Sequence, residues 1–338
     1  MNSISKPTPP VKPQYNYISS PAKPTTIGCC DQGTYTEIYQ PENPYIDTNG
    51  NRKVVIYLHG FCLGPSQVYG THIQHLVQQG YYVIYPNYQV GFCKFPSHKI
   101  TSIKDLIRAA LSPYPLSSQT WLKNAVKMTA QAYQTAKLPK TNVDTFLFGH
   151  SLGGLFALSW QTYSPSTEAT NIQLKQIVVA DPVPSSYSNI PAPIQNIIRC
   201  LGGLRDEIKI KDTGKDITIP VAILHGKDDQ IVPCEDWVEN FPYIHSQQKT
   251  MYLSSSDNHG SPAMYANHEQ ATIDTSFICN CVANIFFNGV GTEDNLDWRY
   301  IWYALDSAIA GKPVDKLTFD MGKWSDGQDV NKIKIYLP

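Results

Sequence analysis

A sharp turn between two apolar runs constrains the fold of this chain most. Residues 145–148 (TFLF) are typical of a short buried strand, and residues 152–160 carry apolar side chains at helical spacing. Between them, the sequence GHSLG at residues 149–153 places Ser151 between two glycines. A strand that passes directly into a helix brings backbone close to both flanking positions, where glycine leaves the necessary room. We therefore expect a strained turn that projects the Ser151 hydroxyl away from the sheet.

Predicted strands and helices alternate along the rest of the chain. Apolar and alternating runs predict strands at residues 34–39, 53–58, 81–85, 177–180, 221–224 and 251–253. Helical spacing of apolar residues marks a segment that ends at Gly80, and further segments at residues 102–111 and 117–137. This alternation predicts the α/β class, with a mostly parallel central sheet covered by helices on both faces.

The composition excludes several classes of protein. The 338 residues carry 27 basic and 28 acidic side chains, for a formal net charge of −1. Such a chain has no positive field with which to bind nucleic acid or an anionic membrane surface, so neither is an expected partner. No run reaches the roughly 20 apolar residues that span a bilayer, so no integral membrane segment is expected. The length and the 42% hydrophobic content are enough for a sizeable core.

Three regions of different composition follow one another. Residues 1–30 are rich in proline, serine and lysine and predict a flexible arm, residues 31–288 hold the α/β pattern, and residues 289–338 form a C-terminal extension. The arm lacks the apolar stretch of a secretory signal, which predicts a cytoplasmic location; a secreted protein whose leader has been removed is the alternative. The extension carries five aromatic residues that favour packing on the domain over a role as a ligand-binding surface. They are Trp298, Tyr300, Trp302, Tyr303 and Trp324.

Eight cysteines are spread thinly over the chain without a metal-binding pattern. No two pairs have the CxxC spacing of a zinc site, so no metal is expected. A scaffold that depends on disulfides would be far denser in cysteine. We expect buried or surface thiols, with one or two bridges if the protein is exported, among Cys29, Cys30, Cys62, Cys93, Cys200, Cys234, Cys279 and Cys281.

Acidic and histidine residues that could activate Ser151 follow it in the chain. A serine hydroxyl becomes a good nucleophile when a base takes its proton and a carboxylate orients that base. The predicted strand at residues 221–224 runs into HGKDDQIVP at residues 225–233, and SDNHG follows at residues 256–260. Loops at the carboxyl ends of parallel strands are where open α/β sheets place functional groups.

These motifs resemble those of the α/β-hydrolase superfamily between Lys53 and Phe287. The matching pieces are LHGF at residues 58–61, GHSLGG at 149–154, the pattern HGxxDxxVP at 225–233 and HG at 259–260. The resemblance implies the α/β-hydrolase fold, with Ser151 as nucleophile, Asp229 as orienting acid and His259 as general base. The glycine at position 154 and the sequence DPV at residues 181–183 lean towards the chlorophyllase-like and polyester-hydrolase-like esterases.

Other residues complete the expected site. Asp181 is the alternative acid, since it also ends a predicted strand, although a carboxylate before proline commonly accepts backbone N–H bonds at a turn. The backbone N–H groups of Phe61 and Leu152 are the expected donors of the oxyanion hole. The other histidines are expected in structural or surface roles: His59, His72, His75, His98, His150, His225, His245 and His268.

The predicted activity is that of a serine hydrolase that cleaves a small-molecule or lipid-like carboxylic ester through an acyl-enzyme. Acyl transfer, thioester hydrolysis and a non-catalytic binding role on the same fold are the alternatives. No cofactor is expected, because the sequence has no phosphate-binding glycine loop and no dinucleotide fingerprint. A stretch with apolar residues could form a lid over the site or pack on the core, with neither favoured: Ile194, Ile197, Ile198 and Leu201.

Overall fold

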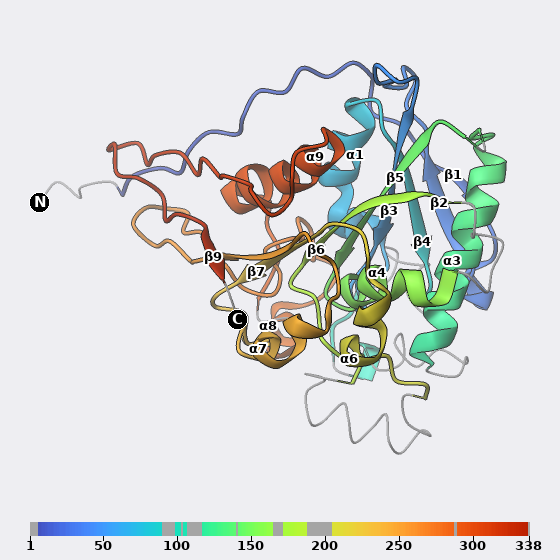
Figure 1. Cartoon of the computed structure of the whole chain (residues 1–338). Coiled ribbons are helices and arrows are strands. Elements are labelled where there is room, and N and C mark those ends of the chain that lie inside the picture. The colour runs from blue at the N-terminus through green and yellow to red at the C-terminus, as the bar shows by residue number, and fades with distance from the viewer. Residues whose placement is uncertain are drawn as a thin grey trace, which may run out of the picture.

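The computed structural model describes residues 6–89, 99–102, 104–106, 117–139, 141–164, 172–187, 205–286 and 289–336. Within these ranges, nine strands form one sheet in the order β1-β2-β4-β3-β5-β6-β7-β8-β9 (Figure 1). The six strands from β3 to β8 pair in parallel with one another. The pairs β1–β2, β2–β4 and β8–β9, towards the two edges, are antiparallel. The predicted α/β class and mostly parallel sheet are thus confirmed.

The strands and helices have the following bounds. The strands are β1 (Thr25–Ile27), β2 (Tyr35–Tyr39), β3 (Arg52–Leu58), β4 (Tyr82–Asn87), β5 (Val143–His150), β6 (Leu174–Ala180), β7 (Val221–Gly226), β8 (Lys249–Ser254) and β9 (Lys334–Tyr336). The helices are α1 (Gly70–Gln78), α3 (Ser118–Thr135), α4 (Leu152–Tyr163), α6 (Ile210–Thr213), α7 (Asp236–Asn240), α8 (Asn280–Phe286) and α9 (Tyr303–Ile309), with a π-helical segment at Asp297–Trp302. Short 3₁₀ turns lie at Cys30–Gln32, Ser66–Tyr69, Gly214–Asp216 and Phe241–Tyr243.

The predicted helix at residues 117–137 corresponds to α3. The Ser117 hydroxyl caps this helix by accepting the Thr120 N–H at 3.1 Å, which satisfies one of the free donors of its first turn. Most of the predicted helix at residues 102–111 lies outside the described residues. Over the described ranges, no helix is both long enough and apolar enough to cross a membrane.

Helices cover both faces of the sheet (Figure 1). Alternate residues of a strand point to opposite faces, so Val54 and Tyr57 of β3 face opposite ways. Val54 packs in a cluster with Ala132 of α3, whereas the Tyr57 hydroxyl lies 3.0 Å from Nδ1 of His72 in α1. The central strands are therefore buried on both sides, which explains their continuous runs of apolar residues.

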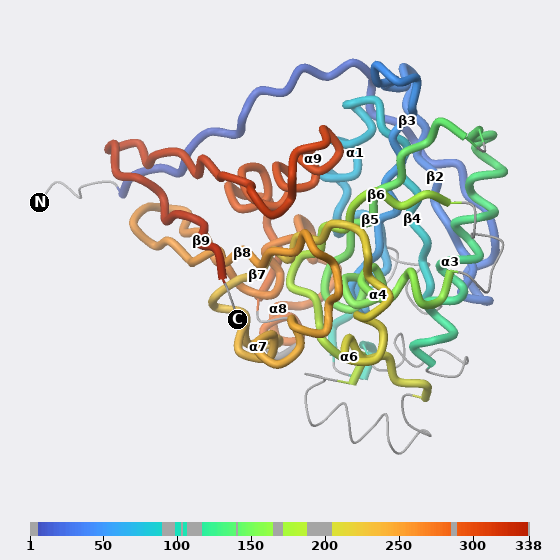
Figure 2. Tube along the Cα trace, in the orientation of Figure 1, coloured from blue at the N-terminus to red at the C-terminus, as the bar shows by residue number. Residues whose placement is uncertain are grey.

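The N-terminal segment is docked on the domain, which differs from the predicted flexible arm. It runs extended over the surface towards β1 and begins beside the C-terminal extension (Figure 2). The N–H groups of Ile18 and Ser19 donate to the carbonyl oxygen of Gln78, at 2.9 and 3.0 Å. Lys12 pairs with Glu293 at 2.6 Å. An extended, proline-rich chain has few hydrogen bonds of its own, and this segment makes its hydrogen bonds to the rest of the fold instead.

The C-terminal extension packs into the same core. The Tyr300 hydroxyl donates to the carbonyl oxygen of Tyr252 in β8 at 2.6 Å and accepts the His225 N–H at 2.9 Å. Trp302 is almost fully buried and stacks on His72 and His75 of α1. These contacts join the extension to the strand ends that carry the candidate site.

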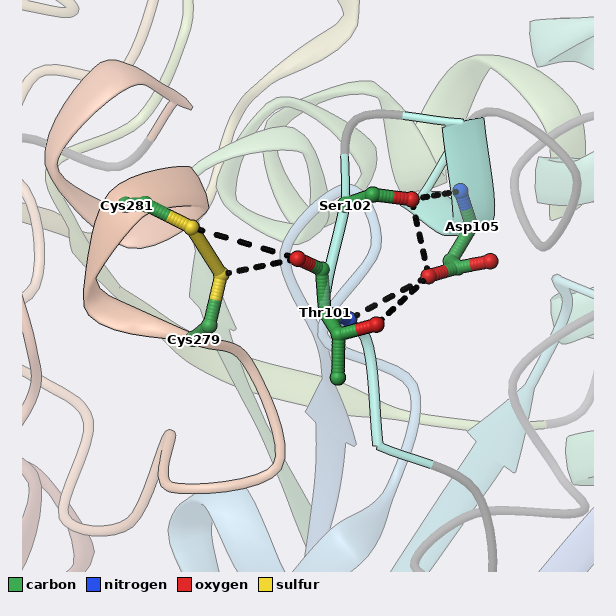
Figure 3. Close-up of a disulfide and its surroundings, with 5 residues drawn as sticks. All are labelled: Thr101, Ser102, Asp105, Cys279 and Cys281. Carbon is green, nitrogen blue, oxygen red and sulfur yellow. Dashed lines mark hydrogen bonds between the residues drawn. A yellow bond between two sulfur atoms is a disulfide. The ribbon is translucent and has the colours of Figure 1, made fainter.

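A disulfide joins Cys279 and Cys281 at the start of α8 (Figure 3). Cys30 is also disulfide-bonded. The Thr101 carbonyl oxygen lies 3.4 Å from the Cys279 sulfur. The thiols of Cys29, Cys62 and Cys234 are free. Positions 93 and 200 lie outside the described residues.

The register of the parallel strands aligns their carboxyl ends. Leu58 of β3 lies opposite Gly149 of β5, His150 lies opposite Ala180 of β6, and Ala180 lies opposite Leu224 of β7. The four loops that follow these strands therefore meet at one edge of the sheet, as expected for functional loops of an open α/β sheet.

Candidate active site

Ser151 occupies a strained turn between β5 and α4. Its φ is 55° and its ψ is −119°, and Leu152 is the first residue of the helix. A Cβ atom at Gly149 would lie 2.2 Å from the carbonyl oxygen of Gly153, and one at Gly153 would lie 2.2 Å from the carbonyl oxygen of Leu58. Both glycines are therefore required by sterics, since no side chain fits so close to backbone. The turn places the Ser151 hydroxyl at the carboxyl edge of the sheet.

His268 and Asp229 complete a hydrogen-bonded series with Ser151. Nε2 of His268 lies 2.8 Å from Oγ of Ser151, and Nδ1 of His268 lies 2.8 Å from Oδ2 of Asp229. The other Asp229 oxygen accepts the N–H groups of Ile231 and Val232 at 2.8 and 2.9 Å. Because a carboxylate can only accept, Nδ1 carries a proton, and in the neutral form of His268 Nε2 presents its lone pair to the serine hydroxyl.

Serine, acid and histidine follow one another along the chain in this order, on a serine turn between a parallel strand and a helix. The chain has the α/β-hydrolase fold. No family model and no curated protein matches the sequence.

Solved structures match the chain at low identity. A monoacylglycerol lipase of Paleococcus ferrophilus is 18% identical, with a TM-score of 0.44 over 70% of this chain and 90% of that one. A monoglyceride lipase of Saccharomyces cerevisiae is 15% identical, with a TM-score of 0.45 over 80% and 94%. Est1E of Butyrivibrio proteoclasticus is 19% identical, with a TM-score of 0.42 over 73% and 93%. Likeness of this degree carries no information on activity, and the chlorophyllase-like branch stays a prediction.

In this hydrolase fold, His259 lies away from Ser151, and its predicted placement beside the serine is wrong. Its Nε2 lies 2.7 Å from Oδ2 of Asp326 near the surface, and its ring packs edge-on against Trp324. The following residue, Gly260, is tightly packed: a Cβ atom there would lie 2.2 Å from the Trp324 ring and 2.3 Å from the carbonyl oxygen of Pro7. The HG sequence thus serves packing between the loop after β8, the C-terminal extension and the N-terminal segment.

The histidine that faces Ser151 carried no local signal in the sequence. Three histidines follow Asp229 in the chain, at positions 245, 259 and 268, and chain order does not distinguish them. The loop after β8 first turns outward, where Asp257 and Met264 pair through backbone hydrogen bonds, and then returns to the sheet at His268. The path of this loop is set by tertiary packing, so spacing from the strand could not identify the residue.

The electrostatics of the series favour an ionised acid and a basic imidazole. Burial would lower the pKa of His268, but the charge and the hydrogen bond of Asp229 raise that pKa to about 9. Burial would likewise raise the pKa of Asp229, and the neighbouring His268 lowers it below its usual value. His268 can accept the Ser151 proton only when it is neutral, so the nucleophile should become more reactive as pH rises.

Asp181, the alternative acid, bonds to Gly226 and Gln270, whereas Nδ1 of His268 contacts Asp229. It is fully buried, its Oδ1 accepts the Gly226 N–H at 2.7 Å, and Nε2 of Gln270 lies 3.0 Å from both of its oxygens. Burial, and then the charge of Asp229, holds the pKa of Asp181 well above its usual value. Asp181 therefore braces the turn after β6 against the loop after β7.

A metal ion has one conceivable set of protein ligands in the described part of the chain. Asp181, His225 and Asp229 bring ligand atoms within 4.8 Å of one another. The Asp229 oxygens already accept hydrogen bonds from His268 and from two backbone amides. An ion there would compete with the contact that orients His268.

The expected oxyanion donors lie in the loops that flank Ser151. The N–H groups of Gly60, Cys62 and Leu63 donate to protein oxygens at 2.8–3.1 Å. For the N–H of Phe61, between them, no acceptor is found among the residues that the structure describes. Leu152 opens α4, and the first N–H groups of a helix have no acceptor within it. The role of the Phe61 and Leu152 N–H groups as oxyanion donors stays a prediction.

The expected lid residues, Ile194, Ile197, Ile198 and Leu201, lie outside the described residues, as does His98. His225 is buried, and its Nε2 donates to the carbonyl oxygen of Val232 at 2.7 Å, which is a structural role.

Proposed function

We propose that this protein is a serine hydrolase that cleaves carboxylic esters through an acyl-enzyme. The proposal is carried by two 2.8 Å hydrogen bonds, from Ser151 Oγ to His268 Nε2 and from His268 Nδ1 to Asp229 Oδ2. In this arrangement Ser151 is the nucleophile, His268 the general base and Asp229 the carboxylate that orients the base. His268 takes the role that the sequence had suggested for His259. The substrate is a small-molecule or lipid-like ester.

The first half of the reaction transfers the acyl group to the serine. His268 Nε2 takes the proton of the Ser151 hydroxyl as that oxygen forms a bond to the ester carbonyl carbon. The carbonyl oxygen becomes negative, and the N–H groups of Phe61 and Leu152 donate hydrogen bonds to it. His268 then gives the proton to the alcohol oxygen as the bond between carbon and that oxygen breaks. The alcohol leaves, and the acyl group stays on Ser151.

The second half releases the acid. A water molecule gives a proton to His268 as its oxygen bonds to the acyl carbon, and the same two N–H groups bind the negative oxygen. The bond to Ser151 Oγ then breaks, and His268 returns the proton to that oxygen. Ester and water have become alcohol and carboxylic acid, and the protein is restored.

Replacement of the serine tests the nucleophile. We expect Ser151→Ala to lower hydrolysis of p-nitrophenyl esters by at least about 10³-fold and to abolish labelling by a fluorophosphonate probe. The matched control is Ser159→Ala in α4, where the buried hydroxyl bonds to Thr213 at 2.9 Å and not to the site. Ester turnover or labelling that persists in Ser151→Ala would exclude the proposal.

Replacement of two histidines in parallel tests the choice of base. We expect His268→Ala to lower kcat by at least about 10³-fold, because no group is left to accept the Ser151 proton. His259→Ala should keep kcat within about twofold, since His259 contacts Asp326 instead. The opposite pattern in p-nitrophenyl acetate assays would contradict the assignment. Product analysis with added alcohol or amine then separates hydrolysis from acyl transfer, and thioester substrates test the remaining alternative.

A further inference from the structure

A series of buried hydrogen bonds connects the loop after β3 with the main chain of His268. The N–H of Gly60 lies 3.0 Å from the Tyr69 hydroxyl, and this hydroxyl lies 2.9 Å from Nδ1 of His150. Nε2 of His150 lies 2.8 Å from the carbonyl oxygen of His268. The side chains of Tyr69, His150 and His268 are at most 3% exposed.

Every hydrogen bond in this chain has a forced direction. A carbonyl oxygen only accepts, so Nε2 of His150 carries the proton and donates to His268. Burial, followed by the charge of His268, lowers the pKa of His150 to about 3, so its ring is neutral and Nδ1 accepts from Tyr69. The Tyr69 oxygen then accepts the Gly60 N–H. The series has one proton arrangement, which favours one geometry.

The two groups at the ends of this hydrogen-bond series are ones whose placement the reaction requires. Gly60 precedes Phe61, whose N–H is an oxyanion donor in the proposed mechanism. A Cβ atom at Gly60 would lie 3.1 Å from Nδ1 of His150 and 3.4 Å from the Cβ of Ser151, so this loop rests directly on the serine turn. At the other end, the carbonyl group of His268 belongs to the residue whose ring faces Ser151.

We propose that Tyr69 and His150 are positioning residues that set the oxyanion loop and the main chain of His268 relative to Ser151. This inference rests on the proposed function. Neither residue touches the reacting atoms; they act through Gly60 and His268. A displacement of about 1 Å in either group would weaken catalysis up to about 10²-fold, because both the proton transfer and the oxyanion hydrogen bonds depend on distance.

The protein contains a matched pair of residues that lacks this connection. The Tyr57 hydroxyl lies 3.0 Å from Nδ1 of His72, and both side chains are at most 1% exposed. Tyr57 packs against Tyr69, with ring centroids 5.2 Å apart. Nε2 of His72 has no hydrogen-bond partner among the described residues, so this pair ends in the core without reaching the site.

The experiment compares Tyr69→Phe with Tyr57→Phe. Each removes one buried hydroxyl that bonds to a buried histidine, so both should lower the thermal midpoint. Tyr69→Phe should lower it more, because it also leaves the Gly60 N–H without its acceptor. We expect Tyr69→Phe to lower kcat on a p-nitrophenyl ester at least tenfold with KM within threefold, and to slow fluorophosphonate labelling equally. Tyr57→Phe should keep kcat within twofold. Equal values of kcat in the two variants would overturn the proposal.

Two substitutions of His150 give an independent test if Tyr69→Phe does not fold. The amide of His150→Gln can donate to the His268 carbonyl and accept from Tyr69, whereas His150→Leu can do neither. We expect the Gln variant to keep at least five times more kcat than the Leu variant; equal loss in both would also overturn the proposal. Wild-type protein without ester turnover or labelling would contradict the proposed function instead, so the two failures are distinguishable.

Discussion

The charge of Asp229 controls when His268 can accept a proton. With that carboxylate beside it, His268 has a pKa of about 9, above its ordinary value. Its neutral, reactive form is therefore the minor form at neutral pH. The contact with Asp229 orients the imidazole. Because the same contact raises the pKa of His268, the activity should depend on pH in the alkaline range.

Replacement of Asp229 tests this dependence. For the wild type we expect kcat/KM to rise with pH, with a midpoint near 9, because the proton must leave His268 first. In Asp229→Asn the negative charge is lost, so the pKa of His268 should fall and the midpoint should move to lower pH, with a lower plateau. Profiles of kcat/KM against pH measure both changes. A midpoint that does not move would show that Asp229 does not set the pKa of His268.

At the level of the elements, the junction of β5, α4 and the end of β3 has no room for an added side chain at Gly153. Gly153 faces the carbonyl oxygens of Leu58 and His59, at 2.2 and 2.5 Å from the position that a Cβ atom would take. The same contact holds the loop that carries Phe61 against the helix that begins at Leu152. The absence of a side chain at Gly153 thus allows α4 to pack closely on β3. It also allows the proposed oxyanion donors to lie near each other.

Two glycine substitutions test this element. We expect Gly153→Ala to destabilise the protein by about 1–3 kcal/mol or more and to lower kcat, because backbone atoms must move to admit the methyl group. Gly70→Ala is the control: Gly70 begins α1 and has nothing within 4 Å of the added Cβ, so this variant should be neutral or slightly stabilising. Urea unfolding with the ester assay measures both. An undisturbed Gly153→Ala would contradict the steric requirement.

For the whole molecule, buried acids in the C-terminal extension link stability to pH. Asp297 is fully buried and accepts the Asp294 N–H at 2.9 Å, while its Oδ1 has no partner in the described ranges. Burial, and then the charge of Asp294, holds the pKa of Asp297 well above its usual value. Burial also raises the pKa of Asp294 to about 6. Both groups are protonated in the folded protein at a pH at which the unfolded chain has ionised them.

This linkage predicts the effect of Asp297→Asn. Groups with a raised pKa contribute stability that is complete below the unfolded value, near 4, and is lost as pH rises through the folded value. We expect Asn, which cannot ionise, to raise the free energy of unfolding by more than about 1 kcal/mol at pH 8, the equivalent of one pKa unit. The gain should shrink towards pH 4. Urea unfolding at both values measures it, and an equal gain at the two would rule out ionisation as the cause.

The cellular location of the protein stays a prediction. The disulfide between Cys279 and Cys281 is typical of an oxidising compartment, which favours the secreted alternative over the cytoplasmic one.

The sequence by itself determined the parts of this protein that depend on local physics. Continuous apolar runs predicted the parallel strands. Two glycines around Ser151 predicted its strained turn, because backbone sterics act between neighbours in the chain. Asp229 was identified through the resemblance of HGxxDxxVP to the motif of the α/β-hydrolase superfamily, and it lies three residues beyond the end of β7, at the sheet edge. Tertiary structure alone decided that His268, and not His259, reaches the serine. Thirteen residues separate β8 from His268. Where such a loop returns depends on packing against Trp324, Pro7 and the extension, which are contacts between segments far apart in the sequence.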